Sequence, residues 1–383
     1  MFLSADDFPR LVALRHDLHR HPEVSGEERE TAKRVAAYLQ QNARPDAMVN
    51  GLGGHGLAAV YESGQPGPTL LLRSELDALP IEEKTGLPYG SSIPGKAHLC
   101  GHDGHTTILT AVATVLARSR PARGRVVLLF QPAEEDGSGA AAVIADPAFA
   151  ELSPDLALSL HNIPGLAIGK AELKAGPVNC ASRGLRLRFA GKTAHASQPE
   201  TGTSPMPALA ELMPALSRLS RGTQSDPDFR LVTVTHAWLG EKAFGIAPGD
   251  GEVWATLRTQ TDAGMAALCH DAEQLAQDAA SRFGLGLSFS YHDIFHHCEN
   301  APDAVAALGE ALDAERISWS AGSLSLRPLE DFGRFRALCP SAMVFLGAGE
   351  TRPALHNPDY DFPDELIELG ARLFLRVIRQ ELG

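Results

Sequence analysis

The sequence predicts an α/β protein in which a catalytic domain, built as a doubly wound sheet, carries an inserted ferredoxin-like domain. Three observations lead to this prediction. The chain has 383 residues, which exceeds the usual size of a single domain. Short apolar runs alternate with helical periodicity towards both ends of the chain. The middle of the chain has another order of elements, β-α-β-β-α-β, which is the ferredoxin-like pattern.

The two ends of the chain supply the elements of the first domain. Residues 8–41 have helical spacing, with a Pro/Gly break at HRHPEVSGEE. Apolar runs bounded by glycine or proline then indicate buried strands. These runs are GLAAVYE (56–62), TLLLRSEL (69–76), GRVVLLFQ (124–131), DLALSLHN (155–162) and SAMVFLGAG (341–349). Helical stretches over 106–119, 139–149 and 363–382 accompany them, which is typical of a doubly wound layer.

The middle of the chain supplies the inserted domain. Its predicted strands and helices are GLRLRFAG (184–191), a helix over 205–221, RLVTVTHAWL (230–239), GEVWATLRTQ (251–260), a helix over 262–283 and GLSFSYHDI (286–294). We therefore predict a metal-binding catalytic domain over residues 1–178 and 295–383. The inserted domain covers residues 179–294.

Composition and charge exclude several classes of function. Hydrophobic residues make up 44% and charged residues 21% of the chain, which is ordinary for a globular protein. The net charge of −13 argues against nucleic acid and anionic membranes as partners. No apolar run is long enough to span a membrane, and the N-terminal residues MFLSADDFPR do not resemble a signal peptide. Five scattered cysteines without a CxxC motif favour a reducing compartment, so we expect a cytoplasmic protein.

Polar residues follow the predicted strands at the points where the strands end. Ligand sites in open α/β sheets form beyond the carboxyl ends of strands. Glu134 and Glu135 follow one strand, and the motif HLCGHDGH lies between two strands. The candidate metal donors at these positions are Cys100, His102, Glu135, His161 and His356. The alternative interpretation is an ordinary loop in which Asp103 caps a helix.

The donor types and their number predict the metal. Thiolate, imidazole and carboxylate together suit zinc, with manganese, cobalt or nickel as alternatives. Five donors exceed the four that one structural zinc needs, so we expect two divalent ions about 3.5–4 Å apart. An adjacent carboxylate pair suits such a centre, because one member binds metal while the other takes a proton from water.

Six motifs, in order, resemble a known family. They are LLRSELDALPIEE, HLCGHDGH, LLFQPAEE, LSLHNIPG, GKTAHASQPETG and LHNPDYDFPDE. The chain resembles the amidohydrolase branch of the aminoacylase/carboxypeptidase-type di-metal peptidases. Relatives in that branch include hippurate hydrolase, indole-acetyl-amino-acid hydrolases and N-acetyldiaminopimelate deacetylase. The resemblance extends over almost the whole chain and implies a two-metal domain interrupted by a lid and dimerisation domain.

The resemblance also implies roles for particular residues. Cys100 would bridge the two ions, and Glu134 would be the general base. His195 of the lid motif would reach the active site of a neighbouring subunit and polarise the scissile carbonyl. Arg258 would bind the substrate carboxylate. The other ligands would be His102, Glu135, His161 and His356, and Asp77 and Asp103 would orient ligand imidazoles.

These roles predict hydrolysis of a C–N amide bond in a small N-acyl amino acid or a related amide. Because His195 would act in a neighbouring subunit, we expect a homodimer or a higher homo-oligomer. One alternative is a dipeptidase or carboxypeptidase, since the same centre cleaves either bond. Another is a catalytically silent homologue that binds small molecules; retention of Glu134 argues against it.

Three positions depart from the family pattern. Glu75 stands where relatives have an aspartate, and we expect only a geometric adjustment there. Gly245 replaces an asparagine that helps to hold the substrate, which leaves substrate recognition at this point open. Arg183 takes a position that is often acidic. It either contacts an acidic group of the substrate or is a surface arginine at a domain hinge.

Overall fold

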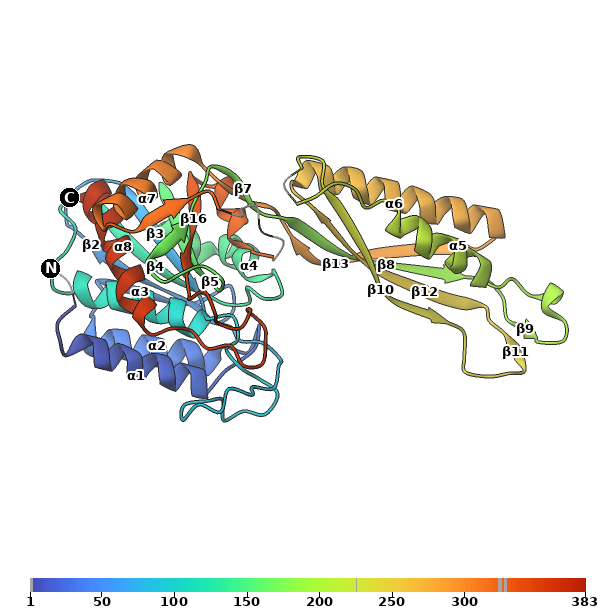
Figure 1. The fold of residues 1–383 in the computed structure, drawn as a ribbon, viewed down its shortest axis with the longest axis horizontal. Coiled ribbons are helices and arrows are strands. Elements are labelled where there is room, and N and C mark those ends of the chain that lie inside the picture. The colour runs from blue at the N-terminus through green and yellow to red at the C-terminus, as the bar shows by residue number, and fades with distance from the viewer. Residues whose placement is uncertain (1–2, 225, 323–325, 327–328) are drawn as a thin grey trace. The chain divides into compact units, whose positions relative to one another are not determined.

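A computed structural model describes residues 3–224, 226–322, 326 and 329–383 (Figure 1). Contacts divide the chain into two compact units. The first unit comprises the described residues of Met1–Val178, Glu299–Leu324 and Glu330–Gly383, and the second comprises those of Asn179–Cys298 and Ser325–Leu329. No helix among the described residues is long and apolar enough to cross a membrane.

The described part of the first unit contains an eight-stranded mixed sheet. In spatial order its strands are β1 (Ala47–Leu52), β2 (Gly56–Glu62), β4 (Arg125–Gln131), β3 (Thr69–Glu75), β5 (Leu156–Ile163), β16 (Ser341–Gly347), β6 (Lys170–Glu172) and β15 (Ser318–Ser320). The central strands β4, β3, β5 and β16 run parallel, whereas β2 is antiparallel to β4. The carboxyl ends of the four parallel strands therefore meet at one edge of the sheet.

Both faces of this sheet are covered, which explains why its strands are continuous apolar runs. Every residue of β3 is buried. Leu70 and Leu72 belong to a large core cluster with residues of the helices, and Leu71, which points to the opposite face, is buried too. Burial of each such leucine contributes about 1.5–3 kcal/mol. The strands are thus fixed in place, and so are the residues at their ends.

The helices of the first unit surround this sheet. They are α1 (Asp7–Arg20), α2 (Arg29–Asn42), α3 (His102–Leu116), α4 (Gly139–Ala145), α7 (Pro302–Ala314), α8 (Glu365–Leu382) and the 3-10 helices η1 (Pro147–Leu152) and η3 (Phe332–Ala337). All residues of α3 are buried. α3 packs against α1, α8 and β3, so its first turn lies inside the unit. The predicted break in 8–41 is the segment between α1 and α2.

The second unit is a four-stranded antiparallel sheet with helices on one face (Figure 1). Its elements are β8 (Ala181–Ala190), β9 (Ala194–His195), η2 (Pro199–Thr201), α5 (Met206–Ser217), β10 (Arg230–Leu239), β11 (Ile246–Ala247), β12 (Asp250–Thr259), α6 (Asp262–Phe283) and β13 (Gly286–Phe295). The spatial order is β10-β12-β8-β13. Two short strands, β7 (Gly176–Asn179) and β14 (Cys298–Asn300), lie where the chain passes from one unit to the other.

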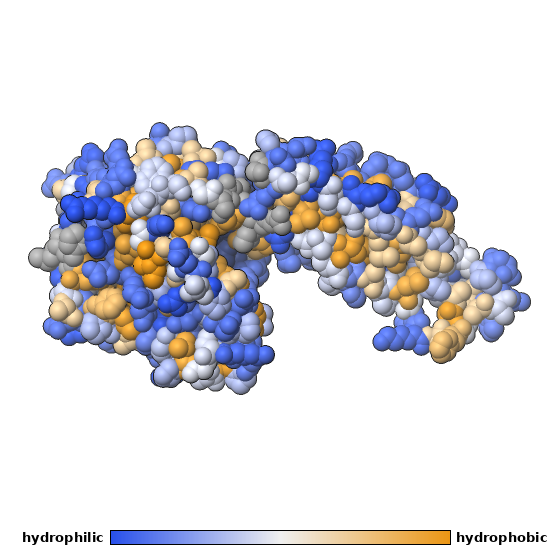
Figure 2. All heavy atoms as spheres, viewed as in Figure 1, coloured by the Kyte–Doolittle hydropathy of each residue, from blue (hydrophilic) through white to orange (hydrophobic). Residues whose placement is uncertain are grey.

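Alternation along β12 separates the two faces of this second sheet. Val253, Ala255 and Leu257 are buried in the core with α5 and α6. Trp254 points to the other face and is 43% exposed. Exposed apolar side chains continue along the hairpin of β10 and β12, and Figure 2 shows apolar surface on this part of the unit. The prediction of an α/β protein is confirmed, with a mixed central sheet.

Candidate metal centre

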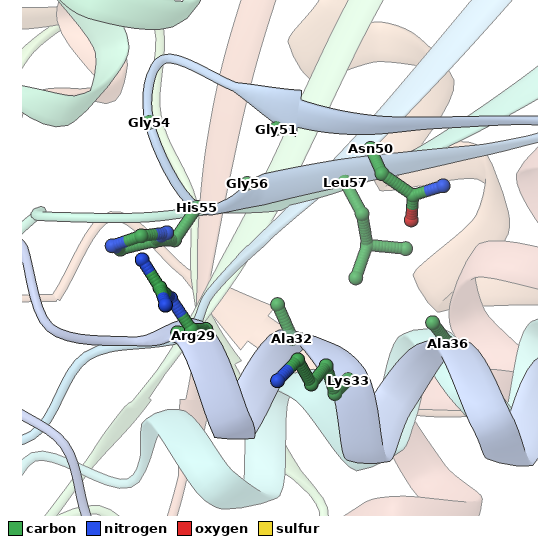
Figure 3. Close-up of a pocket in the computed structure, with 10 residues that line it drawn as sticks. All are labelled: Arg29, Ala32, Lys33, Ala36, Asn50, Gly51, Gly54, His55, Gly56 and Leu57. Carbon is green, nitrogen blue, oxygen red and sulfur yellow. The ribbon is translucent and has the colours of Figure 1, made fainter.

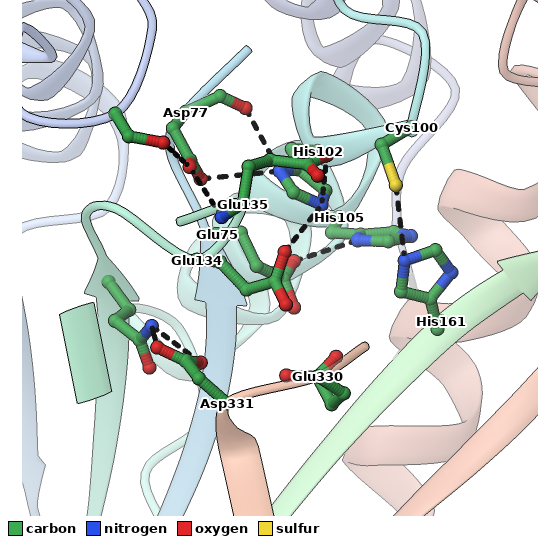
Figure 4. A network of polar contacts seen from close by, with 12 residues as sticks. Glu75, Asp77, Cys100, His102, His105, Glu134, Glu135, His161, Glu330 and Asp331 are labelled. Carbon is green, nitrogen blue, oxygen red and sulfur yellow. Dashed lines mark hydrogen bonds and ion pairs between the residues drawn. The ribbon is translucent and has the colours of Figure 1, made fainter. Parts of the chain in front are cut away.

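The predicted metal donors of the first unit lie together at the carboxyl ends of the parallel strands. Glu134 and Glu135 follow β4, and His161 is in β5. Cys100 and His102 flank Gly101, which adopts a φ of 96° at the start of α3. A Cβ at Gly101 would lie 2.5 Å from the Asn162 side chain, so only glycine fits there. Figure 4 shows these side chains pointing towards one another.

His102 has one ring nitrogen fixed and the other directed at the carboxylate pair. Its Nδ1 donates a hydrogen bond of 2.9 Å to the backbone oxygen of Asp77. That bond places the hydrogen on Nδ1 and leaves the lone pair of Nε2 available. Nε2 lies 3.8 Å from Glu134 and 3.9 Å from Glu135. His102 is therefore oriented as a metal ligand.

Cys100 and two further histidines complete the cluster. The Cys100 Sγ lies 3.5 Å from the His161 Nε2, while the His161 Nδ1 donates to the backbone oxygen of Asn162 at 2.8 Å. The His356 Nε2 lies 3.6 Å from the Glu135 Oε1. The Nε2 atoms of both histidines thus face other candidate donors.

The arrangement of these donors fits divalent metal ions. The His102 Nε2 and the Glu135 Oε1 are buried without a hydrogen-bond partner among the described residues. Separations of 3.5–3.9 Å between donor atoms match those expected around one ion with bonds of about 2.0–2.3 Å. Two groups of donors overlap: one is Cys100, His102 and His161, and the other is Cys100, Glu135 and His356. Cys100 belongs to both groups.

Without a cation, this cluster holds protons. Burial, and then the charge of Glu135, raise the pKa of the Cys100 thiol well above its usual value. Burial also raises the pKa of Glu135 to about 7. For Glu134, burial and the nearby carboxylates raise the pKa well above its usual value. His102 is buried, which alone would lower its pKa, but the nearby carboxylates, first that of Asp77 at 3.4 Å from Nδ1, raise it to about 10. An incoming cation would displace these protons.

The structure adds residues that the sequence reasoning missed. Arg73 is fully buried beneath the cluster and pairs with Glu75, Glu330 and Asp331. Oxygens of Glu134, Glu330 and Asp331 lie within 4.8 Å of one another. Figure 4 shows Glu330 and Asp331 close to the carboxylate pair. A charged Arg73 inside the apolar run TLLLRSEL was a signal that buried acids must lie nearby.

The two aspartates predicted to orient imidazoles differ. Asp77 contacts His102 as described, and its Oδ2 accepts the Glu135 backbone N–H at 2.9 Å. The Asp103 carboxylate instead contacts Arg15 at 3.2 Å and His19 at 2.8 Å, and no proposed ligand. It does not cap α3 either. The reason is geometric: adjacent residues on a helix point in different directions, so Asp103 faces α1 while His102 faces the strand ends.

His105 has no ring nitrogen left for a metal. Its Nδ1 lies 2.7 Å from Glu75, and its Nε2 faces the side-chain oxygen of Asn162 at 2.5 Å. The longer Glu75 side chain thus reaches both Arg73 and His105. Glu75 therefore fixes Arg73 and His105 beside the cluster, and it is not one of the proposed metal donors.

The remaining candidates, His195, Arg258 and Gly245, belong to the second unit. His195 is exposed, and its partner in the β9–β11 pair is Ile246. The backbone N–H of Ser197 donates to the His195 Nδ1 at 3.2 Å, so the hydrogen is on Nε2. Arg258 lies on β12. Gly245 has open space around its Cβ position, and its carbonyl accepts from the Ala196 N–H, next to His195.

Arg183 has partners inside the second unit. Its Nη1 lies 3.9 Å from the Cys269 Sγ, and its guanidinium lies over the Tyr291 ring at 5.7 Å. These contacts favour a packing role for the side chain over a free surface arginine.

A separate pocket lies between α2 and the β1–β2 turn of the first unit. Figure 3 shows Arg29 and His55 beside each other in it. The pocket has a volume of about 220 Å³ and contains none of the predicted site residues.

Fold and donors together define a metal-dependent hydrolase with an α/β core. The model of peptidase family M20/M25/M40 matches residues 71–380, so the chain belongs to this family and the predicted resemblance is confirmed. N-acetylcysteine deacetylase of Bacillus subtilis is 28% identical over 367 residues, with 95% of each chain covered. Hippurate hydrolase of Campylobacter jejuni is 31% identical, with 95% of this chain and 94% of the relative covered. The predicted class of enzyme, an amidohydrolase, is confirmed.

Solved structures share the fold. One is a dinuclear metal-binding peptidase of the M20 family from Bacillus subtilis, which has 24% sequence identity. It superposes with a TM-score of 0.84 over 99% of each chain. This likeness extends over both units of the fold.

Proposed function

We propose that the protein is a di-metal amidohydrolase that cleaves the C–N amide bond of a small N-acyl amino acid. Its products are a carboxylic acid and an amino acid. The observation that carries the proposal is the buried cluster of Cys100, His102, His161 and the pair Glu134–Glu135 at one edge of the sheet. The deacetylase and the hippurate hydrolase to which the chain is similar support this class of substrate.

We assign two divalent ions to the cluster, with zinc as the first candidate and manganese, cobalt or nickel as alternatives. Cys100, shared by both donor groups, is the proposed bridging ligand. The other proposed ligands are His102, Glu135, His161 and His356. When bound, such ions activate water and polarise the amide carbonyl. The dinuclear peptidase with the same fold supports the number of ions.

Glu134 is the proposed general base. Its side chain is buried, 5% exposed, and lies beside the donors without pairing directly with Arg73. From this position its carboxylate can take the proton of the attacking water. It can then pass that proton to the departing amine nitrogen. Asp77 keeps the His102 ring and the Glu135 backbone in place during both transfers.

The second unit is the proposed lid and dimerisation domain. With hydrogen on Nε2, His195 can donate to the carbonyl oxygen as negative charge develops there. Arg258 is the proposed partner of the substrate carboxylate. We further propose that His195 acts in the site of a second copy of the chain, so that the enzyme is at least a homodimer. The free thiols among the described cysteines support a reducing, cytoplasmic location.

A substrate panel tests the proposed reaction. The purified protein, loaded separately with each of the four metals, is offered N-acetyl and N-benzoyl amino acids together with dipeptides, and release of free amine is measured. We expect turnover of N-acyl amino acids to exceed that of dipeptides. The reverse preference would indicate a peptidase. A metal-loaded protein that turns over nothing would indicate a binding homologue.

Mixing inactive variants tests the action of His195 across subunits. His195→Ala and Glu134→Gln are each expected to be nearly inactive alone. If each active site combines Glu134 of one subunit with His195 of the other, a mixed dimer contains one intact site. Activity should therefore return on subunit exchange. No recovery in dimers shown to have exchanged subunits would contradict action in trans.

A further inference from the structure

The turn that carries Glu134 and Glu135 has an unusual backbone conformation just before the pair. Ala133 has a φ of 51°, in the left-handed region that residues with a Cβ rarely adopt. Such a conformation persists only where contacts hold it. The Ala133 carbonyl accepts from the Gly139 N–H at 2.9 Å, and the Ala133 N–H donates to the Glu28 Oε1 at 2.8 Å. Both peptide groups of Ala133 are therefore held.

Glu28 comes from the segment between α1 and α2, far from this turn in the sequence. Its side chain is completely buried. The same Oε1 also accepts the Gly26 N–H at 2.9 Å, while Oε2 has no hydrogen-bond partner among the described residues. A buried carboxyl group with one oxygen unpaired costs stability. Stability of the fold alone therefore does not explain a glutamate at this position.

The same segment holds the other side of the carboxylate pair. Ser25 Oγ donates to the Asp77 Oδ2 at 2.8 Å. That oxygen also accepts the Glu135 N–H at 2.9 Å. The segment thus contacts the backbone before the pair directly, through Glu28. It contacts the backbone of Glu135 indirectly, because Ser25 binds the Asp77 oxygen that accepts the Glu135 N–H.

We propose that Glu28 is a positioning residue for the metal centre. Its Oε1 holds Ala133 in the left-handed conformation, and this conformation directs both Glu134 and Glu135 into the donor cluster. If the bond is lost, Ala133 can relax to a more favourable φ, which rotates the residues that follow. This inference about Glu28 depends on the proposed function only because that function makes Glu134 the general base and Glu135 a metal ligand.

The test compares two substitutions of similar size at Glu28. Glu28→Gln keeps an oxygen that can accept from the Ala133 N–H, whereas Glu28→Met does not. We expect Glu28→Met to weaken cobalt binding and to lower kcat, each by about tenfold or more, with KM changed less. Glu28→Gln should remain within about threefold of the wild type in both. Cobalt affinity is read from the absorption of the bound ion. Equal losses in both variants, or no loss in Glu28→Met, would overturn the proposal.

Ala133→Gly supplies a second test, because glycine adopts a positive φ without help. In that background, Glu28→Met should change cobalt affinity by less than about threefold. A loss as large as in the wild-type background would mean that Glu28 acts in another way. This comparison also serves if Glu28→Met alone does not fold.

The matched control is Glu23→Met in the same segment. Glu23 accepts from the Thr31 N–H and hydroxyl at the start of α2 and does not touch Ala133. The Glu23→Met substitution should lower the unfolding temperature and leave the cobalt affinity unchanged. Cobalt binding separates the two proposals: a wild type that hydrolyses no amide contradicts the function, whereas the binding comparison still decides the role of Glu28.

Discussion

Two buried polar clusters of the first unit start from neighbouring residues of α3 and are built in opposite ways. The donor cluster contains Cys100, His102, Glu134, Glu135 and His161, and in it two neighbouring carboxylates face one imidazole: the His102 Nε2 lies 3.8 Å from Glu134 and 3.9 Å from Glu135. The arginine cluster contains Arg15, His19, Asp103, Asp361 and Asp364. In it, acids and cations contact one another directly.

The difference lies in where the compensating charge comes from. Arg15 and His19 both contact Asp103 inside the protein. The Asp103 carboxylate, acting against burial, raises the pKa of His19 to about 9. In the donor cluster, acids face acids and burial raises their pKa values. A buried charge needs a partner. In the arginine cluster, residues of the protein itself supply the opposite charges, so we expect this cluster to serve stability. In the donor cluster, the proposed metal ions would supply the opposite charge, so we expect this cluster to serve function.

Glu134→Gln gives the largest expected effect and tests the functional half of this comparison. Loss of the proposed general base should lower kcat by about 10²–10⁴-fold. Metal content and unfolding temperature should change little, because Glu134 is not a proposed ligand and the amide has nearly the same shape. Steady-state kinetics on the best substrate of the panel, with metal analysis of the same sample, measures this. Activity within about fivefold of the wild type would show that another group takes the proton.

Asp103→Asn tests the structural half. It leaves Arg15 and His19 buried without their shared carboxylate, which we expect to cost about 3 kcal/mol or more of unfolding free energy. Denaturant titration measures this change. Metal content and kcat of the folded variant should stay within about threefold of the wild type. The control Asp7→Asn breaks a pair with Arg118, which is partly exposed, and should cost only about 1 kcal/mol. If kcat of the folded Asp103→Asn variant fell by more than about threefold, the arginine cluster would contribute to catalysis as well as to stability.

The sequence predicted what depends on local pattern. The helix at 262–283 and the strand at 230–239 coincide with α6 and β10, because their periodicity and their end residues are local signals. β1 was missed, since half of the residues of AMVNGL are exposed and the segment carries no strict alternation. The ends of the central strands could also be placed at one edge of the sheet, and that placement brings Glu134, Glu135 and His161 together.

The rest of the site depends on contacts between distant residues. Arg73 and Asp331 are 258 positions apart, and no local pattern in LRPLEDFG indicates a buried acid. The direction of Asp103 was also unpredictable, because the sequence does not say which helix packs beside α3. The contact of Glu28 with Ala133 joins two turns and has no periodicity at all.

Metal affinity should depend strongly on pH, since the donor cluster is the one that holds protons. Cys100, Glu135 and His102 all have raised pKa values. Ions must displace these protons, so affinity should rise with pH, by about tenfold or more per unit between about pH 6 and 7.5. Competition with a chelator at several pH values measures this dependence. Affinity that is flat over this range would mean that the donors are already deprotonated in the free protein.

The smallest effect is expected on substitution of Arg183. This substitution tests whether the second unit also contains an arginine whose partners lie inside the protein. Its side chain, like that of Arg15, has partners inside its own unit: Cys269 and the Tyr291 ring. Arg183→Ala should therefore lower stability slightly and change kcat/KM by less than about twofold, because exposed cation–π contacts contribute only about 0.5–1 kcal/mol. The measurement compares N-acyl derivatives of acidic and neutral amino acids. Equal small changes in kcat/KM on both kinds of substrate would show that Arg183, like Arg15, has a structural role. A loss confined to the acidic substrates would instead make Arg183 a contact for the substrate, and the second unit would then contribute charge to substrate recognition.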